Sequence, residues 1–183
     1  MTTLSAPLAF CLDASPAPWG TAQRSGDRDG IRRAVERTIE LARIGDQAGV
    51  ESFWLLEDPD GWDALAVLGA IARETERIRL GTGVVNPYYR HPALIAASMS
   101  TLDMLSDGRA FLGFGRGQDE WYRIAMGMDT GKPTRRLEES FDLLRQWWSP
   151  EMRASAPEGA TELPVQGWER TIRPVQAHLP VYL

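Results

Sequence analysis

The sequence predicts an α/β fold of the TIM-type (β/α) barrel class, with four strand–helix units and the start of a fifth strand. Short apolar runs alternate with helical periodicity, and strands that are apolar on both faces are typical of a parallel sheet covered by helices. Long loops follow the strands, as in a barrel. A doubly wound sheet would instead carry a glycine-rich phosphate turn after its first strand, and none follows Leu12. A full barrel needs roughly 250 residues, so we expect these 183 residues to form about its N-terminal half.

Five apolar, β-branched runs define the predicted strands. They are Leu8–Leu12, Val50–Leu56, Arg77–Val85, Arg109–Gly115 and Leu179–Leu183. An apolar face that recurs with helical spacing defines four helices between them. These cover residues 31–48, 62–72, 94–105 and 137–148.

Capping and breaking residues place the helix ends. Asp29 is the predicted N-cap of the first helix and Gly49 its stop. Asp58 or Asp60 is a candidate cap for the second helix. A proline at position 92 suits a first helical position, which makes His91 either a cap or a loop anchor, with a general base as the alternative.

Long connections mark where function is expected. The segment 13–29, rich in Pro, Gly and Ser, follows the first strand, and the partly helical segment 117–133 follows the fourth. Loops of that length are often functional, so we expect both to face a substrate. Residues 149–179 are rich in Pro and Gly.

Composition excludes several classes of partner. The net charge is −5 with both signs scattered, and no basic cluster interleaved with aromatic residues suggests a nucleic-acid surface. Small molecules are the expected partners. The single cysteine, Cys11, is expected to be a buried structural thiol in a reducing compartment. Neither a signal peptide nor a membrane span is predicted, so we expect a cytoplasmic protein.

The third predicted strand, which ends just before Asn86-Pro87, combines apolar residues with Gly81 and Gly83. Two explanations are open for these glycines. A crowded barrel interior requires small residues at some inward positions. Alternatively, a flat ligand lies against the strand end, where the backbone must be approached closely.

Few other residues suggest chemistry. Glu57 and Asp58 adjoin at a strand end, where alternation predicts that at most one faces the barrel mouth and is catalytic. The run from Gly113 to Gly117 misses the G-x-G-x-x-G pattern at Gln118 and indicates a tight exit from a strand. With two histidines in the chain, neither a metal site nor a Ser/His/Asp arrangement is predicted.

Several longer runs resemble the bacterial luciferase-like family of flavin-dependent monooxygenases and deazaflavin-dependent reductases. The runs that carry the resemblance are Gly49–Glu57, Arg77–Val84, Arg90–Ala96, Thr101–Gly117, Arg136–Phe141 and Ile172–Gln176. The resemblance covers nearly the whole chain but only the first half of the family's barrel. It implies a single luciferase-like domain over residues 1–183 that is incomplete at its C-terminus.

The resemblance also implies a cofactor site. FMN, or alternatively the deazaflavin coenzyme F-420, would lie across the barrel mouth, with Glu57 and Asp58 at the edge of its ring. A non-proline cis peptide in deazaflavin-binding members aligns between Gly83 and Val84. An Asp-His pair of one dehydrogenase branch aligns with Glu57-Asp58, so this chain lacks that histidine. The predicted cofactor-binding residues are Gly81, Thr82, Gly83, Val84 and Asn86.

Two functions are therefore open. The first is an oxidoreductase in which reduced FMN and oxygen act on a small organic substrate, or F-420 transfers a hydride to or from it. The second is a non-catalytic half-barrel subunit or truncated remnant that associates with a partner, either as a homodimer or with a complementing C-terminal half-barrel. The family commonly dimerises through the second and third helices, where Trp62, Leu65 and Met99 lie, although core packing explains these residues equally well.

Overall fold

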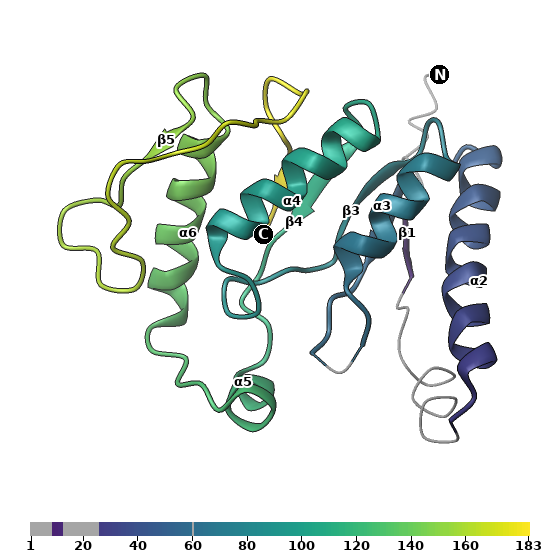
Figure 1. The fold of residues 1–183 in the computed structure, drawn as a ribbon, viewed down its shortest axis with the longest axis horizontal. Helices are drawn as coiled ribbons and strands as arrows, with labels where there is room; N and C mark the ends of the chain where they lie inside the picture. Colours follow the sequence, from purple (N-terminus) through teal and green to yellow (C-terminus); the bar gives the residue numbers. More distant parts are fainter. Residues whose placement is uncertain (1–8, 13–25, 60) are drawn as a thin grey trace, which may run out of the picture.

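A computed structural model describes residues 9–12, 26–59 and 61–183 (Figure 1). Five strands form one parallel sheet in the order β1-β2-β3-β4-β7. The strands are β1 (Ala9–Leu12), β2 (Ser52–Leu55), β3 (Arg79–Thr82), β4 (Ala110–Gly113) and β7 (Val181–Tyr182). The parallel α/β architecture predicted from the sequence is confirmed, and the last predicted strand pairs with β4 as the start of a fifth unit.

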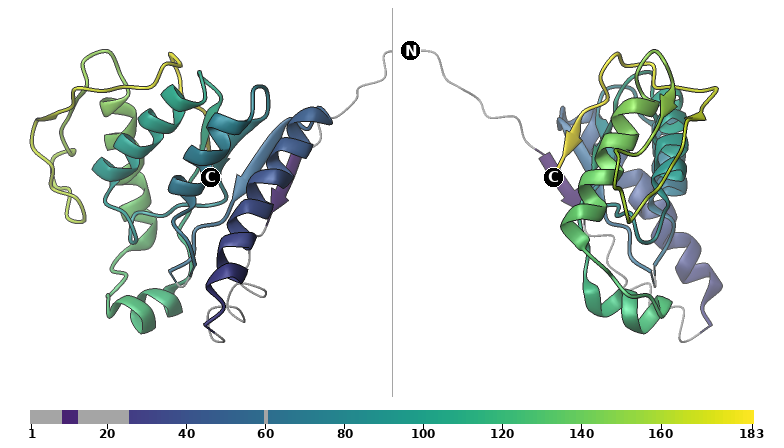
Figure 2. Two further views of the ribbon diagram at one scale, coloured as in Figure 1. Left: turned by 45° about the vertical axis from the view of Figure 1, so that its right-hand side comes forward. Right: turned by 90° about the vertical axis from the view of Figure 1, so that its left-hand side faces the viewer.

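Helices cover one face of this sheet (Figure 2). They are α2 (Arg28–Gln47), α3 (Ala64–Glu74), α4 (Pro92–Leu105) and α6 (Pro133–Trp147). A fifth helix, α5 (Asp119–Met126), lies beyond the carboxyl ends of the strands at the bottom of Figure 1. The partly helical character predicted for residues 117–133 is thus confirmed.

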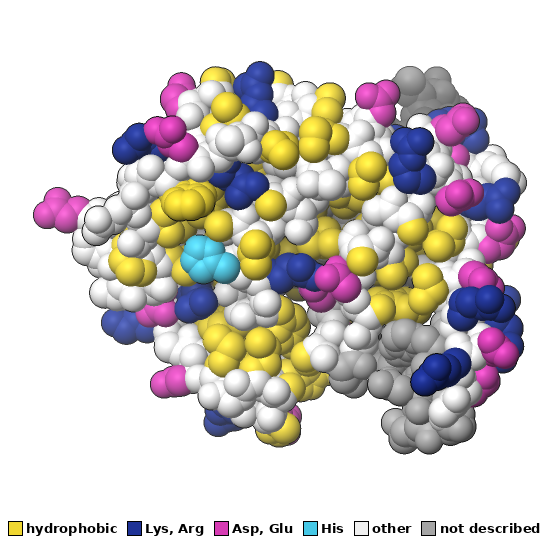
Figure 3. Space-filling view, viewed as in Figure 1, with side chains coloured by type: hydrophobic (Ala, Val, Ile, Leu, Met, Phe, Trp, Pro, Cys, Tyr) yellow, Lys and Arg dark blue, Asp and Glu magenta, His cyan; other side chains and the backbone are white. Residues whose placement is uncertain are grey.

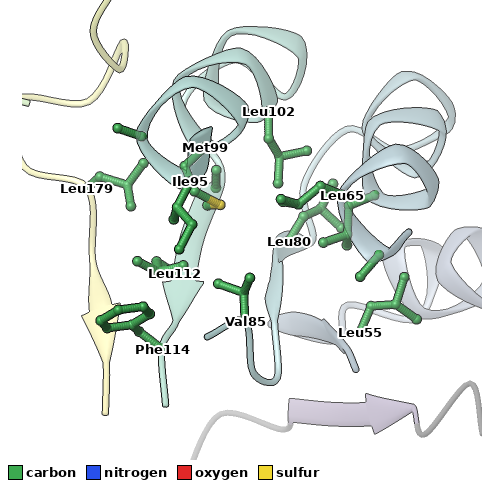
Figure 4. Packing of buried hydrophobic residues seen from close by; sticks show 14 of the residues in the cluster. Leu55, Leu65, Leu80, Val85, Ile95, Met99, Leu102, Leu112, Phe114 and Leu179 are labelled. Carbon is green, nitrogen blue, oxygen red and sulfur yellow. The ribbon is translucent and has the colours of Figure 1, made fainter. Parts of the chain in front are cut away.

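Alternation along each strand divides the sheet into two faces. Leu55, Leu80 and Leu112 point into the layer of helices, and Figure 4 shows Leu55 and Leu80 beside Leu65, and Leu112 near Met99. Leu65 and Met99 are therefore core residues, as the packing explanation predicted.

The opposite face of the sheet carries aromatic side chains. The Trp54 ring lies 4.4 Å from Phe111 and 5.1 Å from Tyr182 between centroids, and the Arg79 guanidinium lies 5.4 Å from the Phe111 ring. A Cβ at Gly81 would overlap both the ring and the carbonyl of Phe111. Crowding on this face thus explains why residue 81 is a glycine, and this explanation does not depend on the role of Gly83.

Two capping predictions are wrong. Asp27, not Asp29, caps α2, because its Oδ1 accepts from the Gly30 N–H at 2.8 Å and Asp29 already lies in the first turn. Asp63, not Asp58, caps α3 by accepting from Ala66 N–H at 3.0 Å.

Asp60, the other candidate cap of α3, lies outside the described residues. Two other predictions of helix ends are confirmed. His91 does cap α4, since its Nδ1 accepts from the Ala93 N–H at 3.2 Å. Gly49 follows α2 with a φ of 78°, a conformation that favours glycine.

The strands are shorter than predicted. After an interruption at residues 83 and 84, Val85 pairs with Phe114 only as an isolated bridge. The backbone N–H groups of residues 77 and 78 donate to Asp46, which lies outside the sheet.

One pair of strands was not predicted. Within residues 149–179, β5 (Arg153–Ala154) and β6 (Trp168–Glu169) form a small antiparallel pair. Most of the predicted loop 13–29 and the side chain of Cys11 lie outside what the structure describes.

Two polar residues, Asp46 and Arg109, link neighbouring strand–helix units at the amino ends of the strands, and we call them the clamps. Asp46 at the end of α2 accepts backbone N–H bonds from residues 76, 77 and 78 at 3.1, 2.8 and 2.6 Å. Arg109 before β4 donates to the carbonyl oxygens of Ala72, Thr75 and Ile78. These bonds fix where β3 begins, and they therefore also fix the position of its carboxyl end.

Charges of both signs are intermingled on the face that α3, α4 and α6 present (Figure 3). Within the described residues, no helix is long and apolar enough to cross a membrane. The described part of the chain also holds no cluster of His, Cys, Asp or Glu suited to a metal ion.

Candidate functional site

A cavity of about 300 Å³ lies at the carboxyl ends of β2, β3 and β4. This is the edge at which α/β proteins of parallel topology bind ligands. Its volume lies at the lower limit of ligand pockets, which hold about 300–1,000 Å³. The residues that line it are Leu56, Glu57, Asp58, Gly83, Val84, Asn86, Tyr89, Gly117, Gln118 and Trp121.

The cavity brings together most, but not all, of the predicted site residues. Gly83, Val84 and Asn86 line it, and both acidic residues do so, although the sequence predicted that at most one would. Gly81 and Thr82 are absent from its lining. Gly81 packs against Phe111, and the buried Thr82 hydroxyl donates to the Gly113 carbonyl at 2.8 Å.

Backbone geometry at the end of β3 shapes one wall. The peptide bond between Gly83 and Val84 is cis, at the position that the family resemblance indicates. On either side of it, Gly83 N–H donates to the Leu55 carbonyl at 2.8 Å and Val85 N–H to the Gly113 carbonyl at 3.0 Å. The wall is thus held by both neighbouring strands. Gly113 and Gly115 allow this approach, because a Cβ at either would overlap residue 82 or 84.

Asn86 organises the loop that follows. Its Oδ1 accepts from the backbone N–H groups of Tyr88 and Tyr89, both at 3.0 Å, and the residue is 2% exposed. This side-chain turn aims the chain away from the sheet and places Tyr89 on the cavity.

Three tyrosines support that loop. The Tyr122 ring of α5 lies 4.4 Å from Tyr88 and 5.2 Å from Tyr89 between centroids. The Tyr122 hydroxyl donates to the Arg116 carbonyl, and burial raises the pKa of this phenol far above its usual range. Tyr122 is therefore a neutral packing residue that anchors α5 beside the cavity.

Glu57 is a buried acid in the cavity wall. Its side chain is 8% exposed, and its Oε1 accepts from both Nε and a terminal nitrogen of Arg90 at 2.7 Å. Its Oε2 is buried and has no hydrogen-bond partner among the described residues. Burial raises the pKa of Glu57, and this effect outweighs the opposing pull of Arg90.

Arg90 also binds a second carboxylate. Its terminal nitrogen lies 2.6 Å from Asp63 Oδ2, while Asp63 Oδ1 caps α3. Burial favours the neutral acid at Asp63, but the bonds from Arg90 and from the Ala66 N–H prevail and lower its pKa. Asp63 is thus the ionised partner of Arg90, whereas Glu57 is the carboxyl group that is more easily protonated.

The lining suits the ring of a flat cofactor better than its phosphate. Backbone at residues 83 and 84, together with Tyr89 and Trp121, offers apolar surface, and Glu57 and Asp58 add polar groups to the wall. The described lining includes two carboxylates and no Lys or Arg. A phosphate would therefore need cations from elsewhere.

Several residues that line the cavity were not predicted individually. The segment 117–133 was predicted to face a substrate, but no sequence pattern distinguished Gly117, Gln118 and Trp121 from its other residues. Gly117 has a φ of 71°, and a Cβ there would meet the Tyr122 hydroxyl. Tyr89 is recognisable only once the turn at Asn86 is known.

Comparison with protein families and curated proteins gives clear matches. The model of the luciferase-like monooxygenase family matches residues 9–183. The chain is 34% identical over 111 residues to 5,10-methylenetetrahydromethanopterin reductase of Methanolobus tindarius, covering 61% of this chain and 34% of that protein. It is also 34% identical over 135 residues to limonene 1,2-monooxygenase of Rhodococcus erythropolis, covering 71% and 34%. The chain thus spans about a third of the length of these relatives.

Solved structures are similar over most of this chain. The coenzyme F-420 dependent tetrahydromethanopterin reductase of Methanopyrus kandleri superposes with a TM-score of 0.71 at 25% identity, covering 81% of this chain and 46% of that one. A monooxygenase of Streptomyces bottropensis gives a TM-score of 0.76 at 22% identity, with 96% and 52% covered. The second likeness concerns the fold alone.

Proposed function

Since this chain belongs to the luciferase-like monooxygenase family, we propose that it forms the ring-binding side of an oxidoreductase that uses FMN or coenzyme F-420. Its curated relatives include a reductase of a pterin derivative and a monooxygenase. The observation that carries the proposal is the cavity at the carboxyl ends of three adjacent parallel strands, with a buried Glu57 oxygen in its wall that has no partner among the described residues. The five-stranded sheet would then be one arc of an eight-stranded barrel.

The residues of the cavity would each contribute a separate task. Backbone at Gly83 and Val84 would support one face of the ring, with Tyr89 and Trp121 excluding water around it. Glu57 and Asp58 would meet polar atoms at the ring edge or on the substrate. When bound, the cofactor supplies hydride transfer or, as reduced FMN, oxygen activation. Burial raises the pKa of Glu57, which makes this carboxyl easier to protonate than an exposed glutamate.

A fluorescence titration tests this proposal. We expect the purified chain to change the emission of FMN or F-420 saturably, and riboflavin to bind about as well as FMN, because the described lining has no cation for the phosphate. Gly83→Leu, which places a side chain at the cavity wall, should abolish the signal. Gly69→Leu, in the surface groove between α3 and α4 and away from the cavity, is the matched control. Absence of saturable binding for all three compounds would refute the proposal for this chain.

The open sheet favours a second candidate function. In the described strands, β1 and β7 occupy the two ends of the strand order, and one sheet face exposes Tyr182, which is 42% accessible. Strand edges and uncovered aromatic faces favour association. The alternative is thus a half-barrel that works only with a complementing half-barrel or a second copy. Sedimentation distinguishes the two, since a monomer that binds flavin contradicts the alternative.

A further inference from the structure

One side-chain network connects the cavity to the helix layer. Arg90, in the connection between β3 and α4, directs two nitrogens to a single oxygen of Glu57, Oε1, at 2.7 Å. The same guanidinium reaches Asp63 at 2.6 Å, and Asp63 is tied to the first turn of α3. The same terminal nitrogen thus contacts both carboxylates, so the guanidinium is restrained by Asp63 as well as by Glu57.

We propose that Arg90 is a positioning residue, which locks Glu57 through Oε1 and so leaves Oε2, buried in the cavity wall, as the acceptor for a hydrogen-bond donor of the bound ligand. The ligand part of this inference rests on the proposed function. The positioning part concerns the chain alone and stands on the geometry of the network.

The asymmetry of the two oxygens is the central observation. A buried carboxylate oxygen without a partner is costly, and the large majority of buried polar atoms in proteins are satisfied. Here one oxygen receives two donors and the other receives none among the described residues, although both belong to a side chain that is 8% exposed. A ligand N–H or O–H in the cavity would complete the shell of Oε2.

Charge around Glu57 gives Arg90 a second effect. The groups that act on Glu57 are Arg90 from the β3–α4 connection, Asp63 from the start of α3, and the adjacent Asp58. Two acids and burial oppose the ionisation of Glu57, and Arg90 alone in this set supports it. Removal of Arg90 would therefore favour a protonated Glu57, which would donate into the cavity where the ionised group accepts.

Titration of the Glu57 carboxyl by carbon-13 NMR measures the effect in the free chain. Protein labelled at the glutamate side-chain carboxyl is titrated, and Glu57→Gln identifies the signal. We expect Arg90→Gln to move the Glu57 midpoint upward. Arg90→Lys, which keeps the charge but loses the planar fork, should give a smaller upward shift.

Arg135→Gln provides a matched control. Arg135 makes a similar bond, from its Nε to the buried Glu139 Oε1 at 2.9 Å, away from the cavity lining. We expect this variant to leave the Glu57 midpoint unchanged. An unchanged midpoint in Arg90→Gln, or an equal shift in Arg135→Gln, would overturn the positioning role. If Arg90→Gln does not fold, Arg90→Lys decides in the same way.

Riboflavin binding tests the ligand part. Glu57→Gln keeps the shape of the side chain and lets its amide oxygen accept from Arg90, which turns an N–H₂ donor toward the cavity. We expect it to weaken riboflavin binding by roughly 10-fold or more, since the ligand loses a hydrogen bond to a charged acceptor. Unchanged affinity in this variant refutes the acceptor role. If wild-type chain binds no flavin while the midpoint shifts as expected, the proposed function fails and the positioning role stands.

Discussion

Asp46→Ala should destabilise the protein by about 3 kcal/mol, through the loss of one carboxylate that holds three backbone N–H groups. Asp46 is 7% exposed and lies at the end of α2. It accepts from residues 76, 77 and 78, so it fixes the path of the chain into β3. Because β3 carries Gly83 to the cavity, this residue positions the site from the opposite end of the sheet.

The magnitude follows from how well water can replace each bond. The N–H of Ile78 is buried, and an unsatisfied buried donor costs about 1–3 kcal/mol. The N–H groups of Glu76 and Arg77 belong to exposed residues, so water can largely replace Asp46 as their hydrogen-bond acceptor. For a chain of this size, about 3 kcal/mol corresponds to a fall in melting temperature of roughly 6–12 °C. Asp46→Asn keeps an acceptor and should cost about 1 kcal/mol.

The effect depends on pH with a defined sign. Burial alone would raise the pKa of Asp46, but the backbone donors from Ile78, Glu76 and Arg77 outweigh it and lower the pKa below its ordinary value of 3.8. A carboxyl with a lowered folded pKa stabilises the protein fully above its ordinary pKa, and this stabilisation is lost as the pH falls through the folded value. The difference between wild type and Asp46→Asn should therefore shrink on acidification.

Urea unfolding followed by circular dichroism, at neutral pH and at acid pH, measures these differences. Glu36→Gln is the control, because it removes an exposed carboxylate paired with Arg32 at 3.5 Å and should change stability by less than about 0.5 kcal/mol. If Asp46→Ala is no less stable than the control, the clamp does not hold β3. A wild-type advantage over Asp46→Asn that stays constant with pH would refute the electrostatic part.

Three further substitutions test other parts of the structure. Gly83→Leu should abolish flavin retention while leaving the circular dichroism spectrum intact, and unchanged binding in a fluorescence titration would contradict the assigned cavity. Gly81→Val should destabilise by about 3 kcal/mol or more, because its side chain would overlap the backbone carbonyl of Phe111 as well as the ring; Phe111→Ala should therefore fail to rescue it in urea unfolding. Arg109→Met should lower stability by about 2–3 kcal/mol, since carbonyl groups of the α3–β3 connection lose their donor; a change below about 0.5 kcal/mol would show that water replaces it.

The strand–helix order was predictable because it depends on local periodicity. Apolar faces at helical spacing located four helices, and Gly49 marked the end of the first because a positive φ favours glycine. The cap at Asp27 was missed by two residues, since Asp29 has the same capping chemistry and only the path of the chain selects between them. The β5–β6 pair has two residues per strand, too few to leave a periodic signal.

The site was predictable in part for a related reason. Glu57, Asp58, Gly83, Val84 and Asn86 stand at strand ends, and parallel strands bring their ends together. Tyr89 and Trp121 reach the cavity through a side-chain turn and a short helix, which no pattern in the sequence reveals. The bond between Arg90 and Glu57 joins residues 33 positions apart and depends on the tertiary fold.

The clamps of Asp46 and Arg109 have a consequence for engineering the protein. They fasten the amino ends of the strands, whereas the cavity opens at the carboxyl ends. Changes at distant, independent sites are nearly additive in free energy. A substitution at Trp121 or Gln118 and a substitution near the clamps should therefore change stability nearly independently. A stabilising change at the clamped end can thus offset a destabilising change made in the cavity to accept a new ligand.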